Sequence, residues 1–370
     1  MNADFDYGDA LPGGPVRGRG AGLNPANRFD SVRLHVLGEH LDECLEAMAP
    51  AARPATQVLA DDSRTIINKL DPANSPDIGF RWTINPYRGC EHGCIYCYAR
   101  PGHEFLGLSC GVDFETKIFA KFEAPKLLQR ELGRPSWKGE TIVLSGVTDP
   151  YQPVEARLAI TRQCLHVLAE CRQPVSIVTK SRLVLRDLDL LRRLASHGAV
   201  RVALSLTSVD AKLSALMEPR ASAQADRLGA MRELSAAGVP VTAMIAPVVP
   251  GLNDHHLPRL LEAAAEAGAT SASHVLLRLP HQIKALFLEW VSRHFPDRAA
   301  HVESLIRQTR GGDLYDARHG VRMRGQGPIA EQIGSMFKLY ARRFGLDGRP
   351  APLSSESFVR PNGDGQMVMF

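Results

Sequence analysis

The chain of 370 residues, 44% of them hydrophobic and 23% charged, has the composition of a globular protein, which excludes a disordered, fibrous or collagen-like chain. Its 44 Lys and Arg residues against 40 Asp and Glu residues give a net charge of +4, too near balance for the whole surface to bind a polyanion. No apolar run approaches the ~18 residues of a membrane-spanning helix, and the N-terminus lacks the basic and apolar regions of a secretion signal, so we expect neither membrane insertion nor secretion.

The N-terminal part of the chain is predicted to lie outside the main domain. Residues 1–30 are rich in Gly, Pro and Arg and hold too little apolar material to offset the entropy of ordering, so we expect a disordered tail. Residues 31–77 are predicted to form an N-terminal extension, with a helix over 40–49 and a loop over 71–77. The core domain should therefore begin at residue 78.

Strands and helices alternate over 78–295, the predicted core domain. Strands are expected at 81–84, 141–145, 174–179, 200–206, 239–245 and 273–277, and helices at 156–171, 185–197, 223–237 and 257–267. This alternation indicates βαβ crossovers and a parallel α/β sheet. Six such units predict a partial, open (β/α)6 barrel related to the TIM barrel. A doubly wound open sheet is the alternative, because periodicity does not distinguish closed from open curvature.

Residues 296–370 are predicted to form a helical C-terminal extension, with helices over 298–309 and 329–344 and a tail after Gly345. From Arg278 to Arg349, 13 Lys and Arg residues face 7 Asp and Glu residues, a local excess of +6. Most of these basic residues are arginines, whose planar guanidinium groups bind phosphate. This basic segment indicates either a nucleic-acid or phosphate-bearing partner or, as the simpler interpretation, a solvated basic face.

Three of the seven cysteines, Cys90, Cys94 and Cys97, lie within eight residues, directly after the first predicted strand. This tight group does not suit a disulfide framework. It indicates metal or redox chemistry in a reducing compartment, by default the cytoplasm. A tetrahedral zinc site would need a fourth protein ligand, and His92 is too close to its neighbours to join easily. Three thiolates with an open fourth position fit an iron–sulfur cluster better.

The spacing C-x3-C-x2-C, with the aromatic Tyr96 just before Cys97, resembles the motif of the radical S-adenosylmethionine (SAM) superfamily. The βα units that follow agree with the partial barrel of that family, over about residues 80–280. The resemblance implies that Cys90, Cys94 and Cys97 bind three irons of a [4Fe–4S] cluster whose fourth iron binds SAM. One electron would cleave SAM to methionine and a 5′-deoxyadenosyl radical, which abstracts hydrogen from a substrate. An electron donor such as flavodoxin or ferredoxin is then an expected partner.

The same resemblance assigns residues to SAM itself. Tyr96 would border the cofactor, and the turn after the second strand would hold the methionine amino group, with Asp149 supplying charge or forming only an Asx turn. Lys180 would pair with the methionine carboxylate, and Ser205 and Thr207 would contact the ribose hydroxyls. The full set is Tyr96, Gly146, Thr148, Asp149, Lys180, Ser205 and Thr207.

Within the superfamily, residues 94–99, 145–149 and 179–181 resemble the spore photoproduct lyase family and a related bacterial branch of unassigned function. Such lyases revert a thymine dimer by hydrogen abstraction, and a separate cysteine then returns a hydrogen atom with help from tyrosines near the cluster. The resemblance therefore implies a lyase-like radical enzyme, although the exact reaction is open.

Tyr98 matches one of those tyrosines, whereas the cysteine has no clear equivalent. Cys110 is the candidate for a reactive thiol, because it is predicted to lie in a loop between Ser109 and Gly111. Cys164 and Cys171 fall on a predicted helix, where buried apolar cysteine is expected.

Three functional hypotheses follow. In the first, the chain is a radical SAM enzyme on nucleic acid, whose target base would have to leave the stack. In the second, the same chemistry acts on a protein or a small molecule. In the third, the chain is a binding module stabilised by zinc or a cluster and has no catalytic activity.

Overall fold

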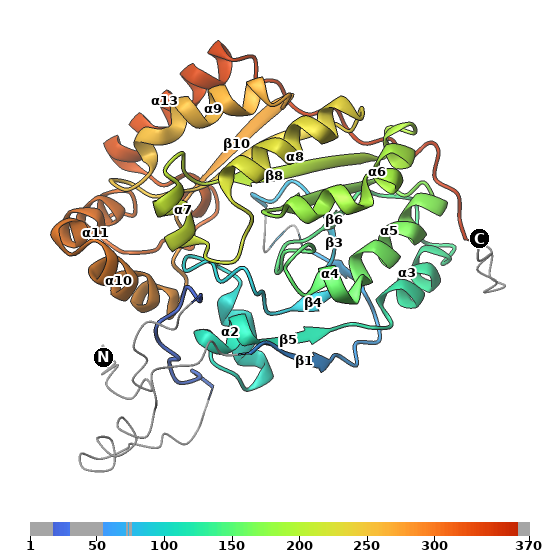
Figure 1. Cartoon of the computed structure of the whole chain (residues 1–370), viewed down its shortest axis with the longest axis horizontal. Coiled ribbons are helices and arrows are strands. Elements are labelled where there is room, and N and C mark those ends of the chain that lie inside the picture. The colour runs from blue at the N-terminus through green and yellow to red at the C-terminus, as the bar shows by residue number, and fades with distance from the viewer. Residues whose placement is uncertain (1–17, 30–54, 72, 74–75, 362–370) are drawn as a thin grey trace.

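The computed structural model describes residues 18–29, 55–71, 73 and 76–361. Its main sheet has seven strands in the order β10-β9-β8-β7-β6-β3-β2 (Figure 1). Six of them are parallel and stand in chain order: β3 (Trp82–Ile84), β6 (Ile142–Leu144), β7 (Val175–Thr179), β8 (Val200–Leu206), β9 (Val241–Val248) and β10 (Ser271–Leu276). The short β2 (Ile67–Lys69) pairs antiparallel with β3 at one edge.

The strand order decides between the two predicted architectures. A barrel adds each new strand beside the previous one, whereas a doubly wound sheet reverses its order at a switch point. Here no reversal occurs, and among the described residues the edge strands β10 and β2 do not pair with each other. The predicted partial (β/α)6 barrel is therefore confirmed, and the doubly wound alternative is wrong.

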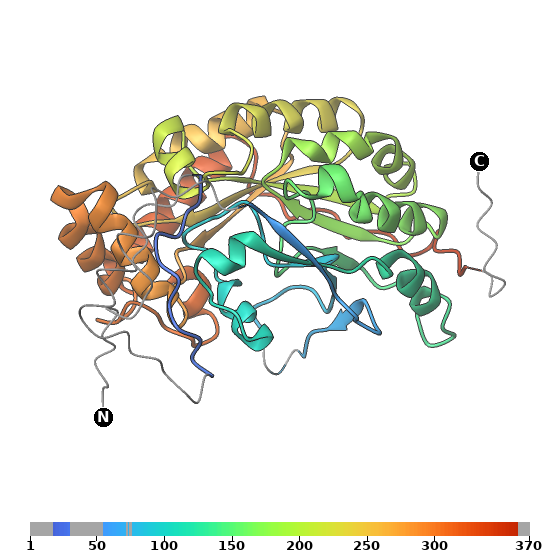
Figure 2. The same ribbon diagram turned by 60° about the horizontal axis from the view of Figure 1, so that its bottom comes forward.

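Helices between the strands cover the convex face of this sheet (Figure 2). They are α3 (Ala124–Leu132), α5 (Ile160–Glu170), α6 (Leu188–Ala195), α8 (Gln224–Ala236) and α9 (Leu257–Glu266). The helix predicted over 156–171 is interrupted, because Ala159 has a left-handed φ of 53° between α4 (Glu155–Leu158) and α5. The Glu155 carboxylate accepts the Thr161 N–H at 3.0 Å and so satisfies a free donor at the start of α5.

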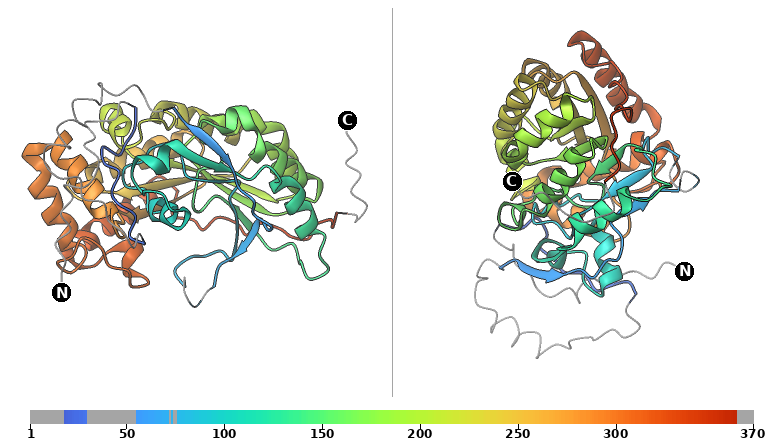
Figure 3. Two further views of the ribbon diagram at one scale, coloured as in Figure 1. Left: turned by 90° about the horizontal axis from the view of Figure 1, so that it is seen from below. Right: turned by 90° about the vertical axis from the view of Figure 1, so that its right-hand side faces the viewer.

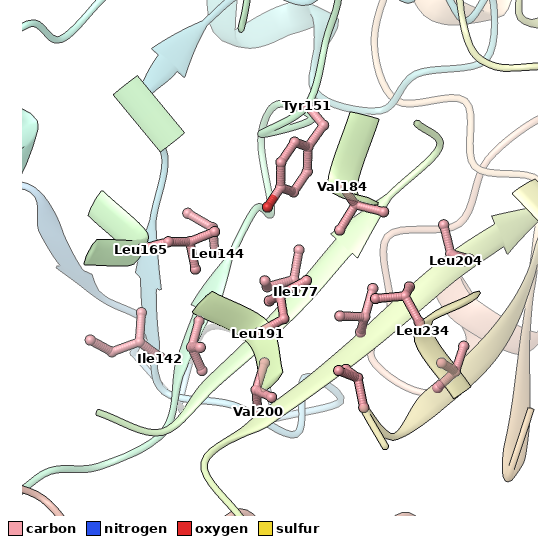
Figure 4. Packing of buried hydrophobic residues seen from close by; sticks show 14 of the residues in the cluster. Ile142, Leu144, Tyr151, Leu165, Ile177, Val184, Leu191, Val200, Leu204 and Leu234 are labelled. Carbon is pink, nitrogen blue, oxygen red and sulfur yellow. The ribbon is translucent and has the colours of Figure 1, made fainter. Parts of the chain in front are cut away.

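The main core lies between the sheet and these helices. The strands carry near-continuous apolar runs, as expected for a sheet buried on both faces. Figure 4 shows Ile142, Leu144 and Ile177 of the strands beside Leu165 of α5 and Leu191 of α6. This packing fixes the strands, and therefore the loops that leave their carboxyl ends.

A second, three-stranded sheet lies apart from the main one and was not predicted. Its order is β1 (Gln57–Ala60), β5 (Lys117–Ala120) and β4 (Tyr87–Arg88). Strands of two to four residues carry too little periodicity to be recognised. The loop that carries Cys90, Cys94 and Cys97, which we call the cysteine loop, lies between β4 and β5. It is followed by η2 (Arg100–Leu106) and α2 (Val112–Thr116), so this sheet supports the segment at both ends.

Residues 18–29, which we call the N-terminal strap, lie along the cysteine loop rather than in a disordered tail. The N–H groups of Gly20 and Ala21 donate to the carboxylate of Glu115, and Gly20 lies so close to Gly93 that an added Cβ would meet the Gly93 carbonyl oxygen at 1.8 Å. The prediction of disorder is wrong for this segment, because its glycines allow a close approach that low apolar content does not reveal. Residues 1–17 and the helix predicted over 40–49 lie outside the described residues.

The C-terminal extension is helical, as expected. After α10 (Ile283–His294) come η5 (Pro296–Arg298), α11 (Ala299–Gln308), α12 (Val321–Arg324) and α13 (Gly327–Arg343). His274 of β10 and Phe337 of α13 pack with ring centres 4.2 Å apart, which joins the last helix to the edge of the sheet. No helix in the described ranges has the length and apolar character needed to cross a membrane.

The segment over 346–361, which we call the C-terminal tail, crosses the molecule at the amino ends of the strands (Figure 3). The Ala272 N–H donates to the Leu346 carbonyl at 2.9 Å, the Ser354 N–H to Gly198 at 3.1 Å, and the Val359 N–H to Cys171 at 2.8 Å. The tail thus lies on the face opposite to the carboxyl ends of the strands.

Candidate active site

The cysteine loop leaves β4 beside the carboxyl end of β3, the face of a barrel where active sites are built. Cys90 and Cys94 are 8% and 7% exposed, Cys97 is partly exposed, and none of the three is in a disulfide. The backbone is tightly wound, since the Cys97 N–H donates to the Cys94 carbonyl at 3.2 Å. Gly93 has a φ of +67°, and a Cβ there would meet the Glu115 carboxylate at 2.7 Å. The turn between the first two cysteines therefore requires glycine.

A buried ion pair holds the loop from behind. The guanidinium of Arg100 donates to the carbonyls of Cys94 at 3.0 Å and Gly111 at 2.9 Å, and it pairs with Glu115 at 2.5 Å. Both side chains are fully buried. Burial alone would lower the pKa of Arg100, but the charge and hydrogen bond of Glu115, together with the charges of nearby cysteines, raise it overall. The guanidinium of Arg100 therefore stays charged and holds the carbonyls of the loop.

A second buried pair lies behind Tyr96. The loop between α7 (Ala211–Met217) and α8 carries Glu218, which is 2% exposed and accepts hydrogen bonds from the Tyr96 hydroxyl and from the Thr207 hydroxyl, the latter at 2.6 Å. Arg227 pairs with Glu218 and donates to the Ser205 carbonyl at 3.0 Å. Burial raises the pKa of Glu218, but the charges of Arg227 and Lys180 and the two hydroxyl hydrogen bonds together lower it overall, so the carboxylate stays ionised.

This arrangement brings together residues that the sequence assigned to SAM and adds two that it missed. Tyr96, Ser205 and Thr207 meet around Glu218 and Arg227, at the end of β8. The hydroxyls of Tyr96 and Thr207 donate to Glu218, and Ser205 is engaged through its carbonyl. Glu218 and Arg227 carry no local motif, because Glu218 contacts the cysteine loop through Tyr96, 122 residues earlier in the chain, and Arg227 is joined to the loop through Glu218.

Asp149 connects the cysteine loop with β7. Its Oδ1 accepts the Thr179 hydroxyl at 2.7 Å and the Tyr151 N–H at 2.9 Å, and its Oδ2 accepts the Lys180 N–H at 2.7 Å and lies 3.4 Å from His92 Nδ1. Burial alone would raise the pKa of Asp149, but His92 and these hydrogen bonds lower it to about 2. The contact with Tyr151 is the Asx turn that the sequence offered as the alternative role. Both oxygens of Asp149 are therefore engaged within the protein.

The turn after β6 meets Tyr98. Ser145 and Gly146 have φ values of 133° and 124°, and the side chain of Asn85 accepts the Val147 N–H at 3.1 Å. The Gly146 carbonyl accepts the Tyr98 hydroxyl at 2.5 Å, while the Tyr98 ring is 47% exposed. Two predicted site residues, Gly146 and Tyr98, are thus in direct contact.

Thr148 lies in the same turn and is 5% exposed. Its hydroxyl donates to the Tyr87 carbonyl at 3.3 Å, so it ties the turn to β4. Of the predicted residues in this turn, Thr148 and Asp149 have side chains that bond within the protein.

Lys180, at the end of β7, points its ammonium toward the aromatic ring of Tyr96, with Nζ 5.9 Å from the ring centre. Among the described side chains this ammonium has no hydrogen-bond or ion-pair partner. Burial alone would lower the pKa of Lys180, but Cys94, Glu218 and Asp149 raise it, so the group stays charged. Lys180 is therefore available to an anionic ligand beside the cysteine loop.

Cys110 lies in the protein interior. It is 1% exposed, and burial raises the pKa of its thiol to about 12. These are properties of a structural cysteine rather than of a reactive one, so the surroundings of Cys110 disfavour the predicted role. Cys164 and Cys171 are 0% and 2% exposed, which confirms their predicted place in the core.

The three loop cysteines fit an iron–sulfur cluster by their chemistry. They supply three free thiols on one loop, and proteins hold such clusters by thiolates bound to separate irons. Within the described ranges, no three His, Cys, Asp or Glu side chains are arranged to hold a single metal ion.

A pocket of about 560 Å³ opens on another side of the same loop, and its walls include His92, Arg182, Arg186 and Arg220. All three arginines are in ion pairs. Arg220 pairs with Glu91 at 3.0 Å, Arg186 with buried carboxylates, and Arg182 with carboxylates of α8. The pocket therefore offers little free positive charge.

Comparisons with known proteins agree with this geometry. Residues 84–264 match the family model described as the radical SAM superfamily. An uncharacterised protein of Mycobacterium tuberculosis is 36% identical over 300 residues, which cover 80% of this chain and 84% of that protein. An uncharacterised protein of Methanocaldococcus jannaschii is 31% identical over 185 residues, 50% of this chain and 66% of that protein. A radical SAM Nα-GlyT isomerase of Pseudomonas phage M6 is 24% identical over 230 residues, 61% of this chain and 46% of that protein.

Among solved structures, the fold resembles that of spore photoproduct lyase. The lyase complexed with dinucleoside spore photoproduct superposes with a TM-score of 0.54 at 17% sequence identity, covering 78% of this chain and 79% of that one. At this identity the likeness concerns the fold.

Proposed function

Because this chain belongs to the radical SAM superfamily, we propose that it binds a [4Fe–4S] cluster through Cys90, Cys94 and Cys97, cleaves SAM, and abstracts a hydrogen atom from a nucleic-acid substrate. The observation that carries this proposal is the loop of three free, mostly buried thiols at the carboxyl ends of an open barrel. When bound, the cluster supplies the electron that splits SAM into methionine and a 5′-deoxyadenosyl radical. The cluster receives that electron from a small electron-transfer protein such as flavodoxin or ferredoxin.

The residues around the loop have separate tasks in this proposal. Lys180 binds the methionine carboxylate, because its ammonium is charged and unpaired beside the cysteine loop. Glu218 and Arg227 keep Tyr96 and the end of β8 in position around the nucleoside part of SAM. Asp149 is a positioning residue, since both of its oxygens hold neighbouring groups of the protein. The Arg100–Glu115 pair keeps the three thiols in one arrangement.

One protein of similar fold supports nucleic acid as the substrate class, because the lyase structure contains a dinucleoside spore photoproduct. The half-exposed ring of Tyr98 suits a nucleotide as well. A nucleobase acted on in a duplex would first have to leave the stack.

The first experiment is anaerobic iron and sulfide analysis, with electron paramagnetic resonance of the reduced protein in the presence and absence of SAM. We expect about four irons per chain and a signal that SAM changes, both lost in Cys94→Ala. Cys171→Ala, a buried cysteine outside the loop, is the matched control and should keep both. One equivalent of zinc, without iron after reconstitution, would support the non-catalytic binding module.

The second experiment follows 5′-deoxyadenosine release with and without single-stranded DNA. Release that DNA stimulates, with a modified base in the product, is the expected result. Release that only peptides or small molecules stimulate would contradict the nucleic-acid substrate while keeping the radical chemistry.

A further inference from the structure

Two arginines without acidic partners lie at the carboxyl end of β10, and one of them contacts Tyr98. Arg278 lies two residues beyond β10, and its guanidinium carbon is 4.8 Å from the centre of the Tyr98 ring. Tyr98 directly follows Cys97, so Arg278 faces the cysteine loop from the last strand of the barrel. Arg310, just after α11, donates to the carbonyl of Leu277, the residue before Arg278, at 2.6 Å. Both guanidinium groups therefore lie at the carboxyl end of β10.

Neither guanidinium is neutralised within the described part of the chain. Arg278 donates only to the Met323 sulfur at 3.7 Å, a weak acceptor, and its Nε is buried without a partner. Arg310 is 2% exposed, bonds only to backbone carbonyls, and also has a buried Nε without a partner. Tyr315 and, to a smaller extent, Asp316 act on Arg310 from a distance, but the carboxylate of Asp316 is already paired with Arg318 at 2.6 Å.

Two other buried arginines near the site each have an acidic partner. Arg100 pairs with Glu115 and Arg227 with Glu218. A buried charge without a partner is costly, and a second like charge beside it adds to the cost. Burial lowers the pKa of Arg310 to about 10, and the neighbouring charge of Arg278 acts in the same direction. A bound anion would remove this cost.

We propose that Arg278, supported by the nearby charge of Arg310, forms a subsite for a phosphodiester group of the substrate, which holds the adjoining nucleotide against the exposed ring of Tyr98. Guanidinium forks bind phosphate oxygens in pairs, and aromatic rings next to guanidinium planes are favourable surfaces for bases. The subsite rests on the proposed function, because it would place the nucleotide beside the residues assigned to the cluster and SAM.

The test measures binding of thymidylyl-thymidine, which carries one phosphodiester, to the full-length holoprotein by calorimetry at low salt. Its methylphosphonate analogue, which lacks the charge, and a peptide with a free carboxylate are the comparison ligands. We expect Arg278→Gln to weaken binding at least about tenfold, since a charge-assisted contact of this kind is worth at least that factor. Arg278→Lys should retain part of the affinity. The matched control is Arg342→Gln on α13, where the side chain is 84% exposed.

A double-mutant comparison makes the test specific. The methylphosphonate should bind wild type as weakly as the charged ligand binds Arg278→Gln, and the two changes together should cost little more than either alone. Equal binding of both ligands to wild type, or equal losses in Arg278→Gln and Arg342→Gln, would overturn the subsite. Preference for the peptide carboxylate would also overturn it. If Arg278→Gln fails to fold, the two ligands still decide the matter on the wild type.

The subsite and the proposed function can fail separately. SAM cleavage by wild type and by Arg342→Gln without substrate, combined with no preference for the charged ligand, would leave the function and remove the subsite. Binding that depends on Arg278, without SAM cleavage, would support the subsite and contradict the proposed function.

Discussion

Glu115 lies at the centre of the contacts that hold the cysteine loop, although it has no place in the cysteine motif. It pairs with Arg100, accepts two N–H groups of the N-terminal strap, and limits the space at Gly93. One buried carboxylate therefore joins three segments of the chain. Removing its charge should affect the stability of all three.

Glu115→Gln should lower the free energy of unfolding by about 3 kcal/mol, because it leaves the charge of Arg100 buried without a partner. Denaturant unfolding of the cluster-free protein measures this directly. Glu303→Gln removes a carboxylate from a partly exposed pair with Arg307 and should cost no more than about 0.5 kcal/mol. Equal losses in the two variants would show that the Arg100–Glu115 pair does not have the role described.

The residues of the site differ in how far the sequence could predict them. The place of Cys90, Cys94 and Cys97 on one loop was predictable, because their spacing confines them to eight residues, whereas their role as cluster ligands stays a prediction. Glu218 and Arg227 were not, because a buried acid and base that meet through folding leave no local pattern. Cys110 was predicted to be a candidate reactive thiol in a loop, but the structure buries its side chain.

At the scale of elements, the contact between β10 and α13 joins the barrel to the C-terminal extension. His274 of β10 packs on Phe337 of α13, and burial, followed by the charges of Arg324 and Lys338, lowers the pKa of His274 to about 4. An unfolded histidine titrates near pH 6.5. The folded protein therefore holds a neutral ring where the unfolded chain takes up a proton.

This difference predicts a stability that falls with acid. The contribution of His274 is complete above about pH 6.5 and is lost as the pH falls toward 4, because only the unfolded state gains the proton over that range. His274→Phe keeps the ring contact and removes the titration. When the pH falls from 7.5 to 5, the unfolding free energy of His274→Phe should decrease by up to about 2 kcal/mol less than that of wild type. Equal decreases in unfolding free energy with falling pH in the two proteins would contradict the role assigned to His274.

Longer elements were also more predictable than short ones. β8 was predicted with its observed bounds, because seven nearly all-buried residues between two helical patterns are distinctive. The strands β1, β4 and β5 were missed, since two to four residues show no period. The N-terminal strap was assigned to a disordered tail because its order depends on close backbone contacts rather than on apolar side chains.

At the scale of the whole molecule, the two ends of the described chain cover opposite faces of the barrel. The N-terminal strap lies on the cysteine loop, and the C-terminal tail crosses the amino ends of the strands (Figures 1 and 3). In barrels, catalysis is a property of the carboxyl ends and stability of the amino ends. The tail should therefore contribute to stability alone.

Removal of residues 351–370 should lower the free energy of unfolding by about 2–3 kcal/mol, since it deletes the backbone hydrogen bonds of Ser354 and Val359 and the contacts of Arg360 with the carbonyls near Trp137. Val359→Pro, which removes one of these donors, should cost about 1 kcal/mol. Iron content after reconstitution should stay as in wild type. Loss of iron with little loss of stability would show that the tail acts on the opposite face.

The backing of the cysteine loop also sets an order of events during synthesis of the chain on the ribosome. The three cysteines and the strap emerge within the first hundred residues, but Ile95 bonds to the carbonyl of Met217 and Tyr96 to Glu218. The loop therefore lacks its contacts with Met217 and Glu218 until more than half of the chain has left the exit tunnel. Delivery of iron and sulfide to a loop in its final shape must then wait until the chain has been synthesised past Glu218, so any maturation factor would meet this protein late in translation or after release.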